Sequence, residues 1–363
     1  MYKETISLRQ AICLMVMFAL GSSVAMGGNS LAGQDSWVLP LLAMVMMIPL
    51  LLIHARTMKL FPETDLFSIM ITLFGKLFGK VLIVLITWYS LHIGSLVLGN
   101  FSDFLILTAL PETPELPLMI AMILVVSFLA GSGIAAMGKW AVAVFAFVLS
   151  VIFLTILMGL KDMDFSNIMP IFEKSPMIFF KGAYQTLALP LADTALFLGV
   201  ADAIKKQDSP YKLYAYAIPI ISLIIMVVSI RNIAILGGAM VGTSLFSSYT
   251  SARIINIGDF LSRIEGTISV NFVFTGITKT SLCLLVASKG MAKLFEIQDY
   301  KRILKPTSML LLALSAIVNT SSMERFGFLE YFSYYIIPFL MLIPFLVWVV
   351  AEIRQKKQAA AQT

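Results

Sequence analysis

The stretch LGSSVAMGG at residues 20–28 interrupts the first hydrophobic segment of the chain, where a helix that begins at Leu8 should continue. Exposed backbone at membrane depth is costly unless it lines a cavity or lies within protein. A second interruption, LPLAD at residues 189–193, lies in the sixth hydrophobic segment. Two broken helices at matching positions of two halves of a chain indicate a transporter-type binding site near the middle of the membrane.

The composition is that of a polytopic membrane protein. Of the 363 residues, 59% are hydrophobic and 13% are charged, and the mean hydropathy is +0.94. Several apolar runs are long enough to cross a bilayer. No cleavage site follows Arg9, so we expect the first segment to remain in the protein. Cys13 and Cys283 fall inside hydrophobic segments and form no disulfide framework. The pI near 9.2 reflects basic cytoplasmic loops, and we expect no nucleic-acid partner.

We predict an all-α integral membrane fold with ten spanning helices, each near the roughly 20 residues that a bilayer requires. They cover residues 8–28, 35–55, 81–107, 116–136, 140–160, 183–204, 212–236, 264–288, 303–322 and 329–352. Residues 65–80 are apolar on one face and carry lysines on the other, which predicts a short interfacial helix before the third span. The Gly/Ser/Thr-rich residues 237–263 are expected to form a lid or cap.

Lysine and arginine positions predict the orientation. With the N-terminus inside, most of the 26 lysines and arginines lie on the inner side, so both termini are expected to be cytoplasmic. Ten spans divide into a first repeat over 1–160 and a second over 161–353, followed by a cytoplasmic tail at 354–363. Because five is odd, the repeats must be inverted relative to each other. This is a LeuT-like architecture in which helices 1 and 6 are the interrupted ones.

The first break offers groups that could hold a ligand. Gly21, Ser22 and Ser23 present unpaired backbone N–H and C=O groups and two hydroxyls. The N-terminus of a half-helix carries partial positive charge and suits an anion such as a carboxylate. The alternative is that these small residues serve close helix packing. With Pro190 in the partner span, we expect a binding site here.

Two ionisable side chains lie inside predicted spans. Asp193 follows Pro190 by three residues, and a carboxylate there is costly enough to mark a functional site. It could accept from a ligand amine, pair with a cation or take a proton; the alternative is a structural acid. Lys279 is the one mid-span lysine of the prediction. It could bind a carboxylate, replace a coupling sodium ion or pair with Asp193.

Other polar residues carry weaker signals. Tyr89 and His92, followed by Asn100, Ser102 and Asp103, make one polar face, in which His92 more often satisfies a packing hydrogen bond. Asp259, Arg263 and Glu265 form an interface charge cluster. No nucleophile elbow, P-loop, nucleotide motif or metal motif appears, so we predict no enzymatic activity, no cofactor and no metal.

Six short motifs, in order along essentially the whole chain, resemble a known family, the permease-like B subunits of GerA-type nutrient germinant receptors in the amino acid–polyamine–organocation superfamily. These motifs are LGSS at 20–23, QDSW at 34–37, PETP at 111–114, LPLAD at 189–193, RIE at 263–265 and KTSL at 279–282. The chain departs from the family in the sixth span, where relatives often carry a Pro-Phe-Gly-Glu-like run and this chain has PLAD. It also lacks the Gly-Ala-Gly-like run that many relatives have after Gly21.

The resemblance implies a receptor in the inner membrane of a bacterial spore. It implies a small nutrient ligand, an amino acid or a sugar, together with a membrane-embedded A subunit and a lipoprotein C subunit. It also implies that positions Gly21, Ile93, Pro190, Lys279 and Cys283 face the ligand. The alternative from the residues is a proton-coupled amino acid transporter with Lys279 or Asp193 as coupling group. A third alternative is a scaffold that binds nothing.

Overall fold

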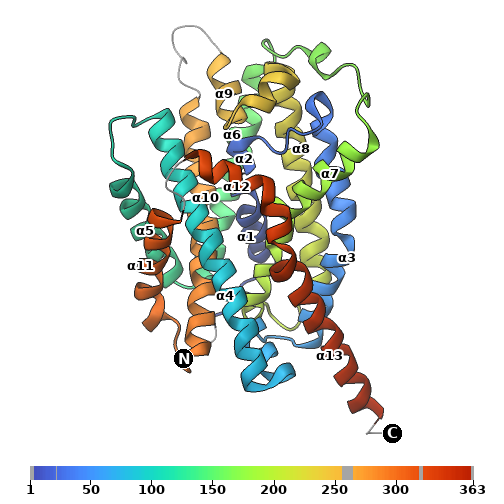
Figure 1. Cartoon of the computed structure of the whole chain (residues 1–363), viewed down its shortest axis with the longest axis vertical. Helices are drawn as coiled ribbons and strands as arrows, with labels where there is room; N and C mark the ends of the chain where they lie inside the picture. Colours follow the sequence, from blue (N-terminus) through green and yellow to red (C-terminus); the bar gives the residue numbers. More distant parts are fainter. Residues whose placement is uncertain (1–3, 22, 256–264, 319–321, 361–363) are drawn as a thin grey trace.

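The chain folds into a bundle of helices in the computed structural model, which describes residues 4–21, 23–255, 265–318 and 322–360. The N-terminal helices are α1 (Leu8–Leu20), α2 (Ser23–Met26), η1 (Gly33–Val38), α3 (Leu39–Leu60), α4 (Leu66–Thr108), α5 (Glu115–Gly131) and α6 (Ile134–Gly159). The C-terminal helices are η2 (Phe165–Ile168), α7 (Pro176–Thr186), η3 (Leu187–Leu191), η4 (Ala192–Ala203), α8 (Pro210–Thr243), α9 (Ser247–Ile254), α10 (Glu265–Leu294), α11 (Lys301–Ile317), α12 (Ser322–Tyr335), η5 (Ile337–Leu342) and α13 (Ile343–Ala360). Figure 1 shows the first described residues and the end of α13 at the same end of this bundle.

Helical segments long and apolar enough to cross a membrane number seven among the described residues. The remaining three predicted spans coincide with α1, α5 and α11, each of which is shorter than these seven. The all-helical membrane fold is therefore confirmed. The count of ten spans and the division into repeats at residue 160 stay predictions.

Helix α1 lies at the centre of the bundle (Figure 1), packed against α6, α8 and α10. Ser7 caps its start: the Ser7 hydroxyl accepts from the Gln10 backbone N–H, and the Gln10 side chain accepts from the Ser7 N–H. The helix is buried on all sides between Leu14 and Leu20, as expected of a helix without a polar face. It ends at Gly21, whose φ of 11° and ψ of −107° leave the helical region. The predicted first break is confirmed.

The second predicted break is also present. Helix α7 passes into the wide turn η3, in which Leu189 has extended backbone angles and Pro190 has no N–H to donate. The chain then continues as the 3₁₀-helix η4, which is buried along almost its whole length. The two interruptions leave η3 and η4 packed against α1 at the bundle centre.

Three predicted elements differ from the structure. The interfacial helix ends at Gly75 and not at residue 80, because Gly75 adopts a φ of +76° that favours glycine and bends α4 there. Helix α8 extends to Thr243 through a bend at Gly237, and the predicted cap is reduced to α9 in the described part of 237–263. The predicted span 329–352 is itself interrupted by η5, so that α12 and α13 run in different directions (Figure 1).

Candidate functional site

A buried ion pair joins two of the predicted site residues. The Lys279 Nζ of α10 donates to Asp193 Oδ2 of η4 at 2.6 Å, and the Tyr89 hydroxyl of α4 donates to Asp193 Oδ1 at 2.6 Å. The two charged side chains are 1% and 0% exposed. Of the alternatives for Lys279, the structure thus shows pairing with Asp193. The pair ties three helices together at the level of the breaks.

Gly21 leaves the space in which the lysine lies. A Cβ atom at Gly21 would lie 2.4 Å from Lys279 Cδ, closer than real side chains approach. The Gly21 carbonyl, freed by the end of α1, accepts from the Thr275 hydroxyl of α10 at 2.9 Å. The ammonium also lies 5.6 Å from the centre of the Phe18 ring. The break in the first helix therefore leaves the space that the Lys279 side chain occupies.

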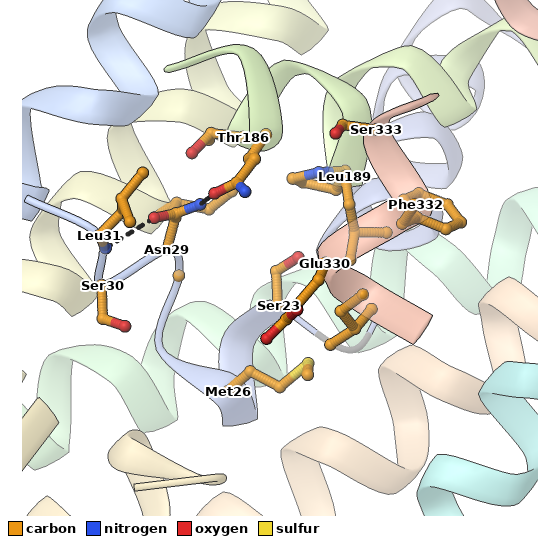
Figure 2. Close-up of a pocket in the computed structure, with 15 residues that line it drawn as sticks. Ser23, Met26, Asn29, Ser30, Leu31, Thr186, Leu189, Glu330, Phe332 and Ser333 are labelled. Carbon is orange, nitrogen blue, oxygen red and sulfur yellow. Dashed lines mark hydrogen bonds between the residues drawn. The ribbon is translucent and has the colours of Figure 1, made fainter. Parts of the chain in front are cut away.

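A cavity of about 340 Å³ lies between the two breaks and α12 (Figure 2). Ser23 of α2, Pro190 of η3 and Glu330 and Ser333 of α12 are among its lining residues. The others are Met26, Gly28, Asn29, Ser30, Leu31, Gln185, Thr186, Leu189, Ile225, Leu329 and Phe332. This volume falls in the usual range for small-molecule sites, about 300–1,000 Å³.

Polar groups from both sides line this cavity. The Asn29 amide donates to Gln185 Oε1 at 2.9 Å, and the Leu31 backbone N–H donates to Asn29 Oδ1 at 2.8 Å. Figure 2 shows the Ser23 hydroxyl and the Glu330 carboxylate directed toward the same space. Glu330 is the one charged side chain among the described lining residues.

A smaller cavity of about 30 Å³ adjoins the larger one, with which it shares Met26, Leu189, Leu329 and Phe332 as lining residues. Ile93, Asn100, Lys279 and Arg325 also line it. The predicted site residues are thus divided. Ser23 and Pro190 line the larger cavity, and Ile93 and Lys279 line the smaller one.

Gly21, Asp193 and Cys283 line neither of these two cavities. Cys283 is fully buried against α4: a Cβ atom at Gly94 would lie 3.2 Å from Cys283 Cβ, and the Ser90 hydroxyl donates to the Cys283 carbonyl at 2.8 Å. Ser22, Asp259 and Arg263 lie outside the described residues. Glu265 begins α10.

The predicted polar face on α4 divides into two contacts with α12. His92 Nδ1 lies 2.8 Å from the Tyr335 hydroxyl, which agrees with a packing role for this histidine. Arg325 pairs with Asp103, its Nε lying 2.6 Å from Oδ2, and with Glu115 of α5 at 2.8 Å. Asn100 faces the smaller cavity, whereas the Ser102 hydroxyl donates to the Leu98 carbonyl of its own helix.

Sequence reasoning missed the contribution of α12 to the cavity. The range 329–352 reads as a largely apolar span, but Glu330 and Ser333 are polar residues at its start. Their spacing of three residues puts them on one face of a helix, which was the available signal. Asn29 and Gln185, which bond each other across the breaks, were missed as well. No group of three or more His, Cys, Asp or Glu side chains suited to a metal ion occurs among the described residues.

Solved structures establish the fold of the chain as that of LeuT-type transporters. Mhp1, a nucleobase-cation-symport-1 family transporter solved in a closed conformation with bromovinylhydantoin bound, matches with a TM-score of 0.71 and 12% identity. The match covers 95% of this chain and 78% of Mhp1. MhsT in complex with L-phenylalanine matches with a TM-score of 0.64 and 11% identity, over 96% of this chain and 89% of MhsT.

Sequence relatives come from Bacillus subtilis (strain 168). The chain is 25% identical to spore germination protein KB, over 99% of its own length and 97% of that protein. It is also 25% identical to YfkT, a second protein with a spore germination name, over 77% of its own length and 76% of YfkT. The family model described as "Spore germination protein" matches residues 5–324. With nearly the whole chain matched and a permease-type membrane fold, the protein belongs to the spore germination protein family.

Proposed function

We propose that the protein is a subunit of a nutrient germinant receptor that binds an amino acid or a sugar and thereby triggers spore germination. The observation that carries the proposal is the cavity of about 340 Å³ between the two helix breaks and α12. Broken helices supply backbone groups and half-helix ends to a ligand, as in transporters of this architecture. Membership in the spore germination family supports the use of such a site to sense a nutrient.

The lining chemistry favours a zwitterionic ligand. Glu330 can accept from a ligand ammonium, and the amides of Asn29 and Gln185, with the Ser23 hydroxyl, can donate to a ligand carboxylate. Lys279 is neutralised by Asp193, so it adds no unpaired positive charge at the cavity. We therefore propose that Ser23 and Pro190 contact the ligand and that Ile93 and Lys279 form the inner wall. Gly21, Asp193 and Cys283 hold that wall in place. Ser22, which the sequence also predicts at the ligand, lies outside the described residues.

A receptor on this fold works as a switch. A ligand shifts a conformational equilibrium only by its differential affinity for the two states. The cavity is lined by α2 and η3 on one side and by α12 on the other, so a ligand that contacts both sides favours the state in which they approach. The buried Lys279–Asp193 pair links this region to α10 and can transmit the change.

The surroundings of the protein are proposed from the family resemblance. The protein lies in the inner membrane of the spore with both termini cytoplasmic, and it assembles with an A-type membrane subunit and a C-type lipoprotein. It acts as a receptor and not as an enzyme. Adjacent genes for both partner types would support this assignment, and an isolated gene would favour transport.

The receptor proposal is tested with spores that carry Ser23→Leu. A deletion strain is first screened with single amino acids and sugars to find the nutrient. The larger side chain fills part of the cavity, so we expect at least about a tenfold higher nutrient concentration for half-maximal germination, equivalent to about 1.4 kcal/mol. Ser150→Leu, on an exposed face of α6, is the matched control. Normal sensitivity of the Ser23→Leu spores at normal receptor abundance would refute a ligand in this cavity.

A proton-coupled amino acid transporter is the second candidate, because a buried carboxylate–ammonium pair is a group that can exchange a proton. Uptake of labelled amino acids by proteoliposomes with an imposed pH gradient separates the two. Accumulation that collapses with the gradient supports transport, and binding without accumulation supports a receptor. A scaffold that binds nothing predicts neither binding nor accumulation in this assay.

A further inference from the structure

Two pairs of lysines face a second cavity, far from the helix breaks. Lys76 and Lys80 lie one turn apart on α4, and Lys289 and Lys293 lie one turn apart on α10, so each pair shares a helix face. All four line a cavity of about 400 Å³. The start of α4 and the end of α10, which line the cavity, lie at the same end of the bundle as the end of α13 (Figure 1). It shares no lining residue with the helix breaks or with the proposed ligand cavity of about 340 Å³.

The bend at Gly75 builds this cavity. It folds the first turns of α4 back, so that a Cβ atom at Gly79 would lie 3.0 Å from the Met70 carbonyl oxygen. The Asp65 side chain caps the folded-back part by accepting from Ser68 N and Ser68 Oγ. The Lys293 ammonium donates to Ser68 Oγ at 3.1 Å, which fixes the short helix to α10. The bend at Gly75 and these hydrogen bonds therefore hold the cavity open between α4 and α10.

Carboxylates neutralise only part of the positive charge. Lys80 pairs with Glu296 at 3.0 Å, and Lys289 pairs with Asp202 at 2.6 Å. The hydrogen bond from Lys80, with the charges of Lys80 and Lys76, lowers the pKa of Glu296, so its carboxylate stays ionised. Lys76 and Lys293 have no carboxylate within ion-pair distance among the described residues. The Asp65 carboxylate also lines the cavity and is linked to Lys293 through Ser68 Oγ. The four lysines thus face three carboxylates, and a net positive charge remains for an anion.

Exposed apolar side chains neighbour the lining residues along the chain. Leu77 is 86% exposed, Phe295 63% and Phe78 51%. Where apolar side chains and lysines occur together at the end of spanning helices, they lie at the level of the lipid headgroups. Basic pockets between spanning helices on the cytoplasmic side of a membrane bind phosphate-bearing headgroups. The proposed orientation, with both termini cytoplasmic, puts this cavity on that side.

We propose that the cavity between α4 and α10 binds a phosphate group, held by Lys76 and Lys293 and flanked by Lys80 and Lys289. The exposed apolar side chains of Leu77, Phe78 and Phe295, next to lining residues in the sequence, favour the headgroup of an anionic lipid over a soluble phosphate. Because α4 also carries Tyr89 and α10 carries Lys279, the occupied cavity fixes the two helices that hold Asp193. The lipid thereby stabilises the buried pair of the proposed ligand site.

The test measures lipid retention on the full-length protein, purified in detergent, by native mass spectrometry. The probes are phosphatidylglycerol, neutral phosphatidylcholine and inorganic phosphate as a competitor. We expect preferential retention of phosphatidylglycerol. We expect the Lys76→Gln/Lys80→Gln protein to bind it about fivefold more weakly or worse, since each lysine near a membrane surface contributes about that factor. Both side chains are partly exposed, so the melting temperature should be retained.

Two further variants sharpen the result. Lys356→Gln/Lys357→Gln removes the same charge from the exposed tail at the same end of the molecule, and we expect no change in retention. Glu296→Gln removes the competing carboxylate, and we expect tighter phosphatidylglycerol binding. Competition by millimolar phosphate without lipid preference would assign the cavity to soluble phosphates. Equal retention of both lipids without phosphate competition, or unchanged binding in the cavity variants, would overturn the proposal.

Discussion

At the scale of single residues, the Lys279–Asp193 pair is a buried ion pair whose loss we expect to lower the free energy of unfolding strongly. Both charges are withdrawn from solvent, so each depends on the other for stabilisation. Asp193 retains a hydrogen bond from Tyr89 when Lys279 is removed. When Asp193 is removed, the contact with the Phe18 ring is what Lys279 retains among the described residues. The two single substitutions therefore differ in what they leave uncompensated.

We predict that Asp193→Asn lowers the free energy of unfolding by about 3–5 kcal/mol, because it leaves a buried ammonium without its counter-charge. Lys279→Gln should cost less, since Tyr89 still donates to Asp193. The double variant should be more stable than Asp193→Asn alone. Thermal unfolding of the detergent-purified protein measures all three. A double variant whose loss equals the sum of the single losses would contradict a direct pair interaction.

The glycine at the first break gives a second prediction at this scale. Gly21→Ala places a Cβ atom 2.4 Å from Lys279 Cδ and 3.2 Å from the Phe18 carbonyl oxygen, so we expect a loss of about 1–3 kcal/mol from overpacking. Gly131→Ala on α5 is the matched control, because a Cβ atom there meets nothing within 4 Å. The control should be neutral or slightly stabilising. Equal melting temperatures of the two variants would show that Gly21 is not required for space.

At the scale of elements, α9 is bonded to the end of the broken first helix. The Ser247 hydroxyl donates to the Met26 carbonyl at 2.7 Å, and the Ser229 hydroxyl of α8 donates to the Gly27 carbonyl at 3.1 Å. Asn232 of α8 bonds the hydroxyls of Ser248 and Ser251 in the same cluster. Helix α9, the described part of the cap that the sequence predicts over 237–263, is therefore bonded to the end of α2, where Met26 lines the cavity.

We predict that Ser247→Ala loosens this contact. One net hydrogen bond contributes about 0.5–1.5 kcal/mol, so amide exchange in α9 and α2 should accelerate roughly two- to tenfold. Thr243→Ala is the control, because the Thr243 hydroxyl donates only within its own helix in the described structure. Hydrogen exchange read by mass spectrometry locates the change. Faster exchange in α9 alone, with α2 unchanged, would contradict the coupling.

The sequence could predict those helix breaks that a single residue causes locally. Glycine at 21 and proline at 190 reveal their breaks because neither residue supports an uninterrupted helix. The bend at Gly75 lay within the predicted interfacial helix, yet a single glycine in an apolar run does not fix where a helix turns. The interruption at η5 depends on how α12 packs across the cavity, which no local pattern encodes. Lys279–Asp193 pairing was predictable only as one alternative, because it joins residues 86 positions apart.

At the scale of the whole molecule, α12 forms one wall of the cavity and is held by ion pairs to two other helices. Arg325 bonds Asp103 of α4 and Glu115 of α5, and all three lie at the start or end of their helices. Opening the cavity by movement of α12 would have to stretch these contacts. In the proposed receptor, the strength of this clamp would contribute to the equilibrium between a closed and an open state on which a ligand acts.

We predict that Asp103→Asn shifts this equilibrium toward the open state, since Arg325 keeps Glu115 but loses its buried carboxylate partner. A Ser333→Cys reporter measures the shift, because Ser333 lines the cavity and the native Cys13 and Cys283 are buried. Its maleimide labelling should become several-fold faster with Asp103→Asn. Asp164→Asn, whose carboxylate bonds Ser166 in an exposed loop, should leave the rate unchanged. If labelling is equally slow in both folded variants, Arg325 and Asp103 do not hold the cavity closed, and the wall that moves must be sought in α2 or η3.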